Sequence, residues 1–515
     1  MKYEQRTPQL RLKLEGWRSR FVLVLAMGGF ALLAGRALGI APGEIRQKIA
    51  NKDRQFVYLK RQISPERAAK VMALRIPGVF EQREYRRYYP AGDLMAHVVG
   101  FTGVDDNGQE GIELAEQSRL AGTPGSRKVI RDRRGRIVED VESMHPPRDG
   151  EEVDLAIDER LQYLAHRELK AAVAAHHAKG GSLAILDART GEILALVNMP
   201  DYNPNNRAHL TGSQTRNRSV TDLFEPGSTM KPFTIAAALD DGIVTPTTVI
   251  DTGPGVMSIG RWPIHDSHPN GVLTVAQVIQ KSSNIGTAKI MLRMKPERMG
   301  TVFRDLGFGV APQTGFPGEA KGLLRPWTQW RPVEQATISY GQGISVSLLQ
   351  IARAYTVFTN DGQLLPLSLL KRDSQPIGKP IFTPRSVREV TRMMETVVMP
   401  GGTAPLARVP GYRVAGKTGT ALKPENGRYA EGKYVSSFVG FGPVSDPRFI
   451  VAVMIDEPEG VRNFGGDVGA PVFASVMGAA LRSMSIPPDA PQTLNVKAAE
   501  PGAVEAQVNG PGSAG

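Results

Sequence analysis

The chain has 515 residues, 41% hydrophobic and 22% charged, which fits two or three folded domains and excludes a disordered or fibrous chain. It has no cysteine, which excludes disulfides and thiolate metal sites. We interpret the His-Asp-Ser-His run at 265–268 as a loop rather than a metal site, and we expect no metal or other cofactor. The net charge of +12 comes from basic residues interspersed with acidic ones, without a nucleic-acid-binding motif, so a membrane surface or an anionic polymer is the expected partner and nucleic acid is not.

The first forty residues have the pattern of a membrane anchor. Basic residues dominate 1–20, and 21–40 is apolar or small apart from Arg36. That length crosses the hydrocarbon core if Arg36 extends to the interface. The basic flank predicts a cytoplasmic N-terminus at 1–20, a transmembrane anchor at 21–40 and all later residues outside the cytoplasm. A cleaved signal peptide is the disfavoured alternative, because no clear small-residue cleavage site follows the apolar run.

Residues 42–150 are polar and basic, and their apolar segments are too short for a large core, so we expect an elongated accessory module. Ser64, Pro65 and Glu66 have the pattern of a helix start, and that helix should run to about residue 76. The other short elements are predicted as a strand-like run at 97–102, a turn at 105–108 and a hairpin at 129–141.

Composition shifts near residue 150, and strands at both ends of 151–486 enclose a helical centre. The predicted strands are 153–157, 182–188, 192–197, 412–421, 435–441 and 449–455, and the predicted helical segments are 158–175, 228–292, 385–398 and 471–484. This order indicates one α+β domain, with an antiparallel sheet assembled from both ends of the segment and flanked by helices. The tail at 487–515 lacks periodicity and is rich in Pro, Gly and Ala, so it is predicted to be disordered.

A candidate nucleophile lies between a Pro-Gly turn and the apolar run 233–239. Ser228 and Lys231 are three residues apart, so a helix places their side chains on one face. A serine needs an adjacent base, and a lysine can be that base when burial or a second cation lowers its pKa. The spacing alone is weak evidence, because Ser368 and Lys371 repeat it in a run that we interpret as a strand, where i and i+3 face opposite ways.

A second polar pair could contribute to the same cleft. Ser282 and Asn284 lie on a short loop between two predicted helices. The serine could relay a proton and the asparagine could hold a substrate amide. Taken alone, the loop is more simply explained by helix capping.

A third motif lies in a strand-like run near the C-terminal end of the domain. Lys417 could supply positive charge to a substrate carboxylate, and Gly419 could allow close approach of a ligand backbone. Thr418 and Thr420 would offer hydroxyls on one face of the strand. The alternative is a plain exposed edge strand with a lysine that blocks further pairing.

The order Ser-x-x-Lys, Ser-x-Asn, Lys-Thr-Gly is far more specific than any one motif alone. With it, the chain resembles the class B penicillin-binding proteins of the FtsI type, the division-specific peptidoglycan transpeptidases, from about residue 54 to 488. Further segments that carry the resemblance are 87–92, 108–113, 120–122, 202–205, 224–233, 340–343 and 400–403.

The resemblance implies a penicillin-binding transpeptidase fold, with a shortened pedestal at 42–150 and a transpeptidase domain at 151–486, held by one helix in the inner membrane with the catalytic domain in the periplasm. It implies a serine-type D-Ala-D-Ala transpeptidase that crosslinks peptidoglycan stem peptides during septal synthesis and is inhibited by β-lactams. Expected partners are the membrane, a lipid-II-polymerising glycosyltransferase of the FtsW type and other division proteins. The implied catalytic residues are Ser228, Lys231 and Ser282; the implied substrate-binding residues are Asn284, Lys417, Thr418, Gly419 and Thr420; and the backbone N–H groups of Ser228 and Thr420 form the oxyanion hole.

One departure concerns the motif R-G-x-x-x-D-R-N-G, which the family carries soon after its membrane helix. This chain passes from residue 40 into later pedestal sequence, and 132–135 resembles the motif only superficially, so the membrane-proximal pedestal is predicted to be deleted, as in a secondary paralogue. A bifunctional class A enzyme is disfavoured, because roughly 100 residues are too few for a glycosyltransferase domain besides the pedestal. A β-lactamase and a catalytically silent division scaffold or β-lactam sensor stay open as alternatives.

Overall fold

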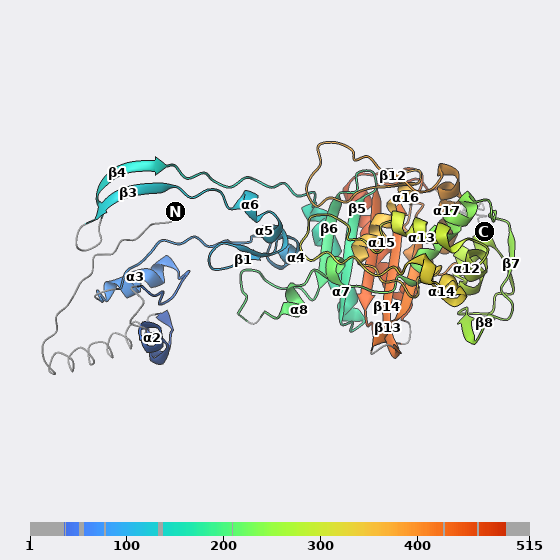
Figure 1. The fold of residues 1–515 in the computed structure, drawn as a ribbon, viewed down its shortest axis with the longest axis horizontal. Coiled ribbons are helices and arrows are strands. Elements are labelled where there is room, and N and C mark those ends of the chain that lie inside the picture. Colours follow the sequence, from blue (N-terminus) through green and yellow to red (C-terminus); the bar gives the residue numbers. More distant parts are fainter. Residues whose placement is uncertain are drawn as a thin grey trace, which may run out of the picture.

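The computed structural model describes residues 35–36, 38–50, 56–76, 79–131, 137–208, 210–425, 428–460 and 463–490, which form a narrow stalk leading into a large body (Figure 1). The predicted cytoplasmic segment, most of the predicted anchor and the tail from 491 lie outside these residues. Within the described ranges, no helix is long and apolar enough to cross a membrane.

The stalk is made of short elements with little buried apolar surface. They are α2 (Pro42–Ile49), α3 (Pro65–Ala73), η1 (Gly92–Leu94), α4 (Ala96–Val99), β1 (Phe101–Thr102), β2 (Gly108–Glu110), α5 (Gly111–Ala115), α6 (Gln117–Leu120), β3 (Ser126–Arg131) and β4 (Ile137–His145). The Ser64 hydroxyl caps α3 by accepting from the Arg67 N–H, and β3 pairs antiparallel with β4, so the predicted helix start and hairpin are confirmed.

The strand predicted from residue 97 is wrong, because residues 96–99 form α4 and β1 begins only at Phe101. The helix has a physical reason. It turns the carbonyls of Ala96 and His97 toward the body, where they accept hydrogen bonds from the Tyr202 hydroxyl (2.9 Å) and the Asn217 amide (3.1 Å). Tertiary polar contacts therefore override the strand-like local pattern.

The body is built on one five-stranded antiparallel sheet in the order β13-β14-β15-β5-β6. Its strands are β5 (Gly180–Asp187), β6 (Ile193–Met199), β13 (Ala415–Glu425), β14 (Arg428–Gly442) and β15 (Phe449–Asp456). The first two come from the start of the domain and the other three from its end, and the halves join where β15 pairs with β5. The predicted α+β fold, with its sheet assembled from both ends of the segment, is confirmed.

Helices cover the sheet, and this explains why β5 and β15 are buried along almost their whole length rather than alternating. Helices α7 and α18 pack on each other and on the sheet, and α9, α15 and α17 also contact its strands. The longer helices of the body are α7 (Glu159–Ala175), α10 (Lys231–Asp240), α11 (Val275–Lys281), α12 (Asn284–Met291), α13 (Pro296–Asp305), α14 (Pro332–Ile338), α15 (Leu348–Ala354), α17 (Pro384–Val397) and α18 (Gly465–Ser483).

The remaining elements of the body are short. They are α8 (Gly212–Thr215), α9 (Arg218–Thr221), η2 (Gly227–Met230), η3 (Trp327–Gln329), α16 (Thr356–Thr359), η4 (Pro405–Ala407), β7 (Val249–Asp251), β8 (Val256–Ile259), β9 (Trp262–His265), β10 (Val272–Thr274), β11 (Gln363–Leu364) and β12 (Lys379–Pro380). The prediction that helices dominate 228–292 is therefore wrong for 249–274, where β7 pairs with β10 and β8 with β9. Glycines with positive φ at 253, 255, 260 and 271 interrupt any helix there.

Two boundaries also change. The strand predicted at 153–157 is reduced to one bridge between Leu155 and Leu370. Residues 487–490, which the prediction assigned to the tail, are held by the body, because the Asp489 carboxylate accepts hydrogen bonds from the backbone N–H groups of Arg413 (2.7 Å) and Ser445 (3.1 Å). The body thus extends to at least residue 490.

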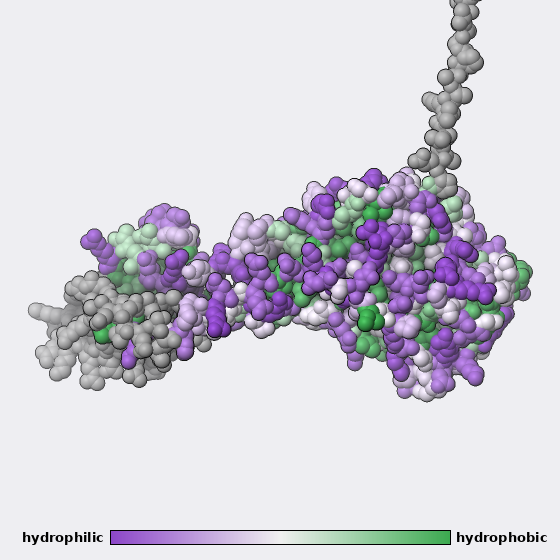
Figure 2. Space-filling view, turned by 90° about the horizontal axis from the view of Figure 1, so that it is seen from above, coloured by the Kyte–Doolittle hydropathy of each residue, from purple (hydrophilic) through white to green (hydrophobic). Residues whose placement is uncertain are grey.

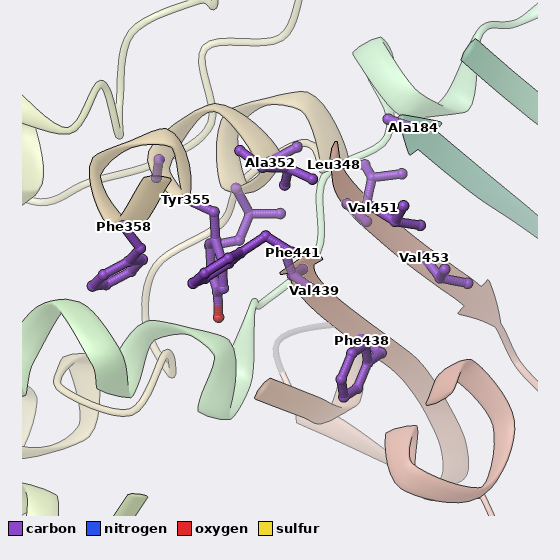
Figure 3. Packing of buried hydrophobic residues seen from close by; sticks show 14 of the residues in the cluster. Ala184, Leu348, Ala352, Tyr355, Phe358, Phe438, Val439, Phe441, Val451 and Val453 are labelled. Atoms are coloured by element: carbon purple, nitrogen blue, oxygen red, sulfur yellow. The ribbon is translucent and has the colours of Figure 1, made fainter. Parts of the chain in front are cut away.

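An aromatic cluster in the core packs behind the candidate nucleophile. The Phe233 ring of α10 stacks on Phe358 at 5.3 Å and meets Tyr355 edge-on at 5.4 Å, and Figure 3 shows Tyr355 among buried side chains of the sheet. The buried Tyr355 hydroxyl donates to the Thr229 carbonyl at 3.1 Å. The core therefore fixes the backbone of the residue next to Ser228.

Candidate active site

Ser228 lies on η2, a 3₁₀ turn that leads directly into α10. In a 3₁₀ turn, residues i and i+3 eclipse each other, so Ser228 and Lys231 project to the same side, as the spacing predicts. Gly227 starts the turn with φ +56°, a conformation that side chains disfavour. Ser228 is half-buried, whereas Lys231 is fully buried.

The loop between α11 and α12 holds Ser282 and Asn284 beside Lys231. Ser282 has φ +59° and ψ +38°, which is left-handed and uncommon outside glycine; this strained backbone directs its groups toward the lysine. The Lys231 ammonium donates to the Ser282 carbonyl (2.5 Å), the Ser282 hydroxyl (3.2 Å) and the Asn284 side-chain carbonyl (2.8 Å). The Asn284 amide nitrogen donates to the His265 carbonyl at 2.9 Å, which fixes the orientation of that side chain.

Burial is the main cause that holds the pKa of Lys231 well below its ordinary value, and the charge of Lys417 acts in the same direction, while Asp266 opposes it. A neutral amine has two N–H donors and one lone pair. The Ser282 carbonyl and the Asn284 oxygen accept the two donors, and the lone pair is then free to take a hydroxyl proton. Lys231 is therefore suited to act as a base.

Lys417 lies inside β13 and is fully buried, so the alternative of an exposed lysine that blocks an edge is wrong. Its ammonium donates to the Ser282 hydroxyl (2.8 Å) and the Thr418 hydroxyl (3.1 Å). Burial lowers the pKa of Lys417 to about 7. Ser282 thus lies between two lysines, within hydrogen-bond distance of both, which is the arrangement a proton relay requires.

Gly419 and the threonines of β13 have contacts of their own. A Cβ on Gly419 would lie 2.7 Å from the Pro226 carbonyl, so the glycine lets the nucleophile turn pack against β13, and its predicted contact with a ligand backbone stays a prediction. The Thr420 hydroxyl accepts from the Gly465 N–H at 3.0 Å, and the Thr418 hydroxyl lies 3.2 Å from that of Thr403. The Thr418 and Thr420 hydroxyls, which the sequence predicted to be free for a ligand, thus already have hydrogen-bond partners within the protein.

The predicted oxyanion hole requires the N–H groups of Ser228 and Thr420 to lie close together. A Cβ on Gly227 would lie 3.4 Å from the Thr420 nitrogen and 3.1 Å from its carbonyl oxygen. The Gly227 N–H donates to the Gly341 carbonyl at 3.2 Å, so a glycine-rich loop holds the turn from its other side. The nucleophile turn is therefore fixed against β13 without intervening side chains.

Sequence reasoning missed Asp266 as a part of the site. Its carboxylate accepts from the Ser283 hydroxyl (2.6 Å) and from the N–H groups of Asn284 (2.6 Å) and Ile285 (3.0 Å). It thereby caps α12 and fixes the backbone of the Ser-x-Asn loop. Ser283 also caps α12 by accepting from Gly286, so the capping interpretation and the catalytic one apply to neighbouring residues of the same loop. No local signal distinguishes Asp266 from other loop aspartates, because its partners lie 17 to 19 residues away.

Glu225 is a second residue that the motifs did not single out. Its carboxylate accepts from the Gly343 N–H (2.8 Å) and from the Tyr429 hydroxyl (3.0 Å). It therefore connects the start of β14 to the segment that precedes Ser228. Burial raises the pKa of Glu225. The acid precedes Ser228 by three residues, but its partners are more than 100 residues away in sequence.

The other sequence candidates do not join this cluster. The Ser368 hydroxyl donates to the Leu370 carbonyl at 2.6 Å, and Ser368 pairs with Glu192 through a strand bridge, so the repeat of the Ser-x-x-Lys spacing is structural. Among the described residues, no three His, Cys, Asp or Glu side chains gather as a possible metal site, and Asp266 serves the loop instead.

Comparison with known proteins gives two family matches. Residues 181–478 match the penicillin-binding protein transpeptidase domain, and residues 30–155 match the penicillin-binding protein dimerisation domain. The transpeptidase match spans more than half of the chain. The chain therefore belongs to the penicillin-binding protein transpeptidase family.

Individual relatives agree with this assignment. The chain is 47% identical over 451 residues to the probable peptidoglycan D,D-transpeptidase PenA of Neisseria gonorrhoeae, a match that covers 87% of this chain and 77% of the relative. It is 42% identical over 456 residues to the peptidoglycan D,D-transpeptidase FtsI of Escherichia coli K12, with 88% and 77% covered. The apo transpeptidase domain of penicillin-binding protein 3 from Burkholderia pseudomallei is 49% identical with a TM-score of 0.61, covering 66% of this chain and 98% of that one.

Proposed function

We propose that this protein is a serine-type peptidoglycan D,D-transpeptidase that crosslinks stem peptides through an acyl-enzyme on Ser228. The main support for this proposal is the buried Lys231, which follows the turn that holds Ser228. Lys231 is fully buried, with a lowered pKa, and contacts Ser282 and Asn284 from a separate loop. The transpeptidase match and the names of the relatives support the reaction class.

In the acylation step, Lys231 takes the proton of Ser228 as the serine oxygen attacks the carbonyl of the penultimate D-Ala. The backbone N–H groups of Ser228 and Thr420 stabilise the oxyanion. The C–N bond breaks, and terminal D-Ala leaves as an amine after receiving a proton through Ser282, which lies between Lys231 and Lys417. When charged, Lys417 attracts the terminal carboxylate of the donor, with Thr418 and Thr420 beside it.

In the second step, the amine of another stem peptide attacks the ester carbonyl and loses a proton to the same relay, which restores the Ser228 hydroxyl and forms the new amide bond. Asn284 positions the amide of the donor peptide. A β-lactam presents a strained amide in place of D-Ala-D-Ala and acylates Ser228, while its ring prevents the leaving group from departing.

The same proposal extends to the setting of the reaction. We assign the protein to septal synthesis during cell division, anchored in the inner membrane by residues 21–40 with the body in the periplasm, and partnered by a glycosyltransferase of the FtsW type. This rests on the basic and apolar N-terminal pattern and on the FtsI name of a relative. Depletion in cells, followed by crosslink analysis and microscopy, tests it: filamentation with fewer crosslinks supports the septal role, and normal division contradicts it.

Labelling with a fluorescent penicillin tests the nucleophile. The wild-type protein should label covalently, while Ser228→Ala and Lys231→Ala should not label, and Ser368→Ala should label as wild type because Ser368 is structural. A Ser228→Ala protein that labels would overturn the assignment. The same label separates a transpeptidase from a β-lactamase, because only a β-lactamase releases it rapidly.

A further inference from the structure

The hairpin formed by β8 and β9 lies at the end of the body away from the stalk, near α14 (Figure 1). The end of β9 belongs to the candidate site, because the His265 carbonyl accepts from the Asn284 amide at 2.9 Å. The other end of β9 begins at Trp262, directly after the turn of the hairpin. The hairpin therefore starts at the site and extends away from it.

A row of apolar side chains runs from the catalytic lysine to the tip of this hairpin. The Tyr340 ring lies 5.9 Å from the Lys231 ammonium, and Tyr340 forms a buried cluster with Ile264 of β9 and with residues of α12 and α14. Trp262 shares a face with Ile264, because alternate residues of a strand point the same way. The row therefore ends at Trp262, which is 46% exposed.

Arg261 gives the tip a second chemical character. Its guanidinium lies 5.1 Å from the centre of the Trp262 ring, and Arg261 is itself exposed. On the mainly hydrophilic surface that Figure 2 shows, a single exposed apolar side chain is ordinary, but this one continues a row that begins at the site. A flat aromatic ring beside N–H donors suits a sugar, which has apolar C–H faces and polar oxygens at its edges.

The length of the substrate fits this position. In a pentapeptide stem, three residues separate the penultimate D-Ala from the sugar, a span of about 10 Å when the peptide is extended. Trp262 lies three residues along β9 from His265, which is also about 10 Å. A stem whose D-Ala reaches Ser228 and whose amide is held by Asn284 can therefore bring its sugar to the tip of the hairpin.

We propose that Arg261 and Trp262 bind the glycan strand that carries the donor stem, with a sugar ring stacked on the indole and the guanidinium donating to sugar oxygens. This inference rests on the proposed transpeptidase function and adds to it a subsite for the polymer. A partner protein fits less well, because the apolar row leads to the base of the reaction, and the reaction itself brings a glycan strand to this distance.

Fluorescence polarisation of labelled, peptide-free glycan strands with the purified full-length protein tests the binding directly. The strands should bind saturably, Trp262→Ala should weaken binding by about tenfold or more, and Trp262→Phe should retain most of it. Tyr163→Ala removes an exposed ring of α7 and should leave binding unchanged. No binding up to about 1 mM strands, or an equal loss in Tyr163→Ala, would overturn the proposal.

Release of D-Ala separates the polymer from the peptide. With glycan strands that carry pentapeptide stems, Trp262→Ala should raise KM about tenfold and leave kcat unchanged, while free pentapeptide should react as with wild type. An equal loss with free pentapeptide would show that the hairpin holds the peptide rather than the sugar. A wild-type KM on the strands would overturn the subsite and leave the tip to a partner protein.

A further variant separates this proposal from the proposed function. Ser228→Ala should bind the peptide-free strands as wild type does but release no D-Ala. Failure of the acyl transfer and failure of the glycan subsite therefore give different results. Penicillin labelling of Ser228 in Trp262→Ala shows that this variant folds.

Discussion

The buried side chains of Lys231 and Lys417 contact the hydroxyl of the same residue, Ser282, whose backbone has a left-handed conformation. The Ser282 hydroxyl lies 3.2 Å from the Lys231 ammonium and 2.8 Å from that of Lys417. At this distance the charge on one lysine disfavours protonation of the other, so the pair titrates as a unit. In the productive state, Lys231 is neutral and can accept the proton of Ser228, and Lys417 is charged and can attract a carboxylate.

This state predicts a bell-shaped pH profile for the second-order rate constant of acylation by penicillin. The rate should fall on the acid side as Lys231 gains a proton, and on the alkaline side as Lys417 loses the charge for which burial sets a pKa of about 7. Lys417→Arg should acylate more slowly but lose the alkaline limb, because a guanidinium stays charged. An unchanged alkaline limb in that variant would contradict the role given to Lys417.

The same shift predicts how stability depends on pH. Burial lowers the pKa of Lys417 from 10.5 to about 7, so between these values the unfolded chain binds more protons, and the free energy of unfolding should rise with pH. Lys417→Met, which cannot titrate, should show a flatter dependence between pH 7 and 10 in denaturant titrations. Parallel curves for the two proteins would show that the lysine is not buried in solution.

Asp266 acts on the site through the loop it caps. Asp266→Asn keeps the shape of the side chain but removes its negative charge. That charge accepts three hydrogen bonds from the loop, and it also opposes the lowering of the Lys231 pKa. We expect a loss of about 1 to 2 kcal/mol of stability and an acid limb of the acylation profile shifted to lower pH. Asp446→Asn, an exposed control, should change neither. An upward shift of the acid limb would refute this role.

At the scale of elements, the site is formed where four segments meet: η2, the loop before α12, β13 and the 340–343 loop. Backbone contacts join η2 to β13 and to the 340–343 loop, and lysine side chains join the loop before α12 to the rest. Glycines make the backbone contacts possible, since Gly227 approaches Thr420 and Gly341 approaches Gly227 without side chains between them. The motifs can be found from sequence because each has a fixed spacing within a few residues. Their glycine contacts cannot, because the partners are distant in the chain.

Gly419→Ala tests this packing. The added Cβ would overlap the Ser437 hydroxyl of β14 and lie 2.7 Å from the Pro226 carbonyl, so the Ser437 side chain and η2 must both shift. We expect a loss of about 1 to 3 kcal/mol of stability, measured by denaturant titration, and slower acylation. Gly212→Ala is the matched control, because its Cβ would meet no atom within 4 Å. Wild-type acylation in Gly419→Ala would show that the turn tolerates displacement.

Local patterns predicted the long elements well and the short ones poorly. Helix α7 begins after the predicted cap Asp158, and the five sheet strands all lie where apolar runs predict them. Residues 249–274 were misassigned because their pairings of three and four residues are too short to show a periodicity. Asp266 and Glu225 were missed because single carboxylates gain their roles only from tertiary contacts.

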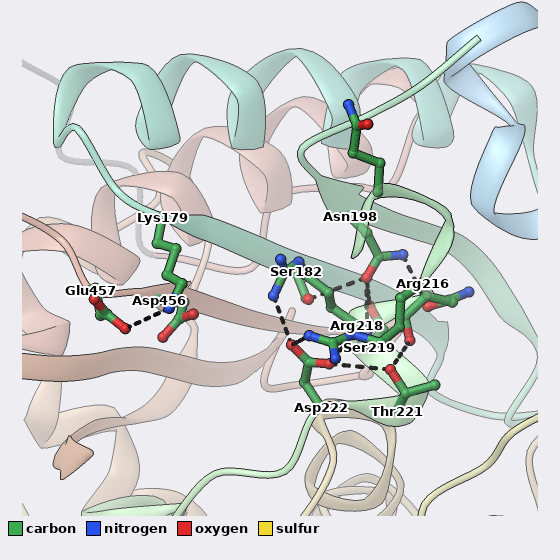
Figure 4. Close-up of polar contacts among 12 residues, drawn as sticks. Lys179, Ser182, Asn198, Arg216, Arg218, Ser219, Thr221, Asp222, Asp456 and Glu457 are labelled. Atoms are coloured by element: carbon green, nitrogen blue, oxygen red, sulfur yellow. Dashed lines mark hydrogen bonds and ion pairs between the residues drawn. The ribbon is translucent and has the colours of Figure 1, made fainter. Parts of the chain in front are cut away.

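At the scale of the whole molecule, buried amides join the stalk to the body. The Asn198 carbonyl accepts from the Ser219 N–H (2.7 Å) and hydroxyl (2.9 Å), and both residues are seen in Figure 4. The Asn198 amide donates to Asn217 (2.9 Å), and Asn217 donates to the His97 carbonyl (3.1 Å). Asn217 and Ser219 flank the start of α9, nine to eleven residues before Ser228. The joint therefore combines a polar network with apolar packing, because Val98 and Ile112 of the stalk belong to the main hydrophobic core.

Asn217→Ala should weaken this joint without removing the chemistry. It leaves the Asn198 amide and the His97 carbonyl without their partner, so we expect a loss of about 2 to 4 kcal/mol and a lower thermal midpoint, while penicillin still labels Ser228 at 25 °C. Asn206→Ala, an exposed site nearby, should match wild type. An unchanged midpoint in Asn217→Ala would mean that water replaces the amide.

The most direct test of the acyl transfer is mass spectrometry of crosslinked product. The full-length protein is incubated with uncrosslinked glycan strands that carry pentapeptide stems, and the digested products are weighed. Wild type should form stem dimers that have lost one D-Ala, and Ser228→Ala should form none while remaining folded. Dimers made by Ser228→Ala, or wild-type products that are only shortened monomeric stems, would contradict a transpeptidase acting through Ser228.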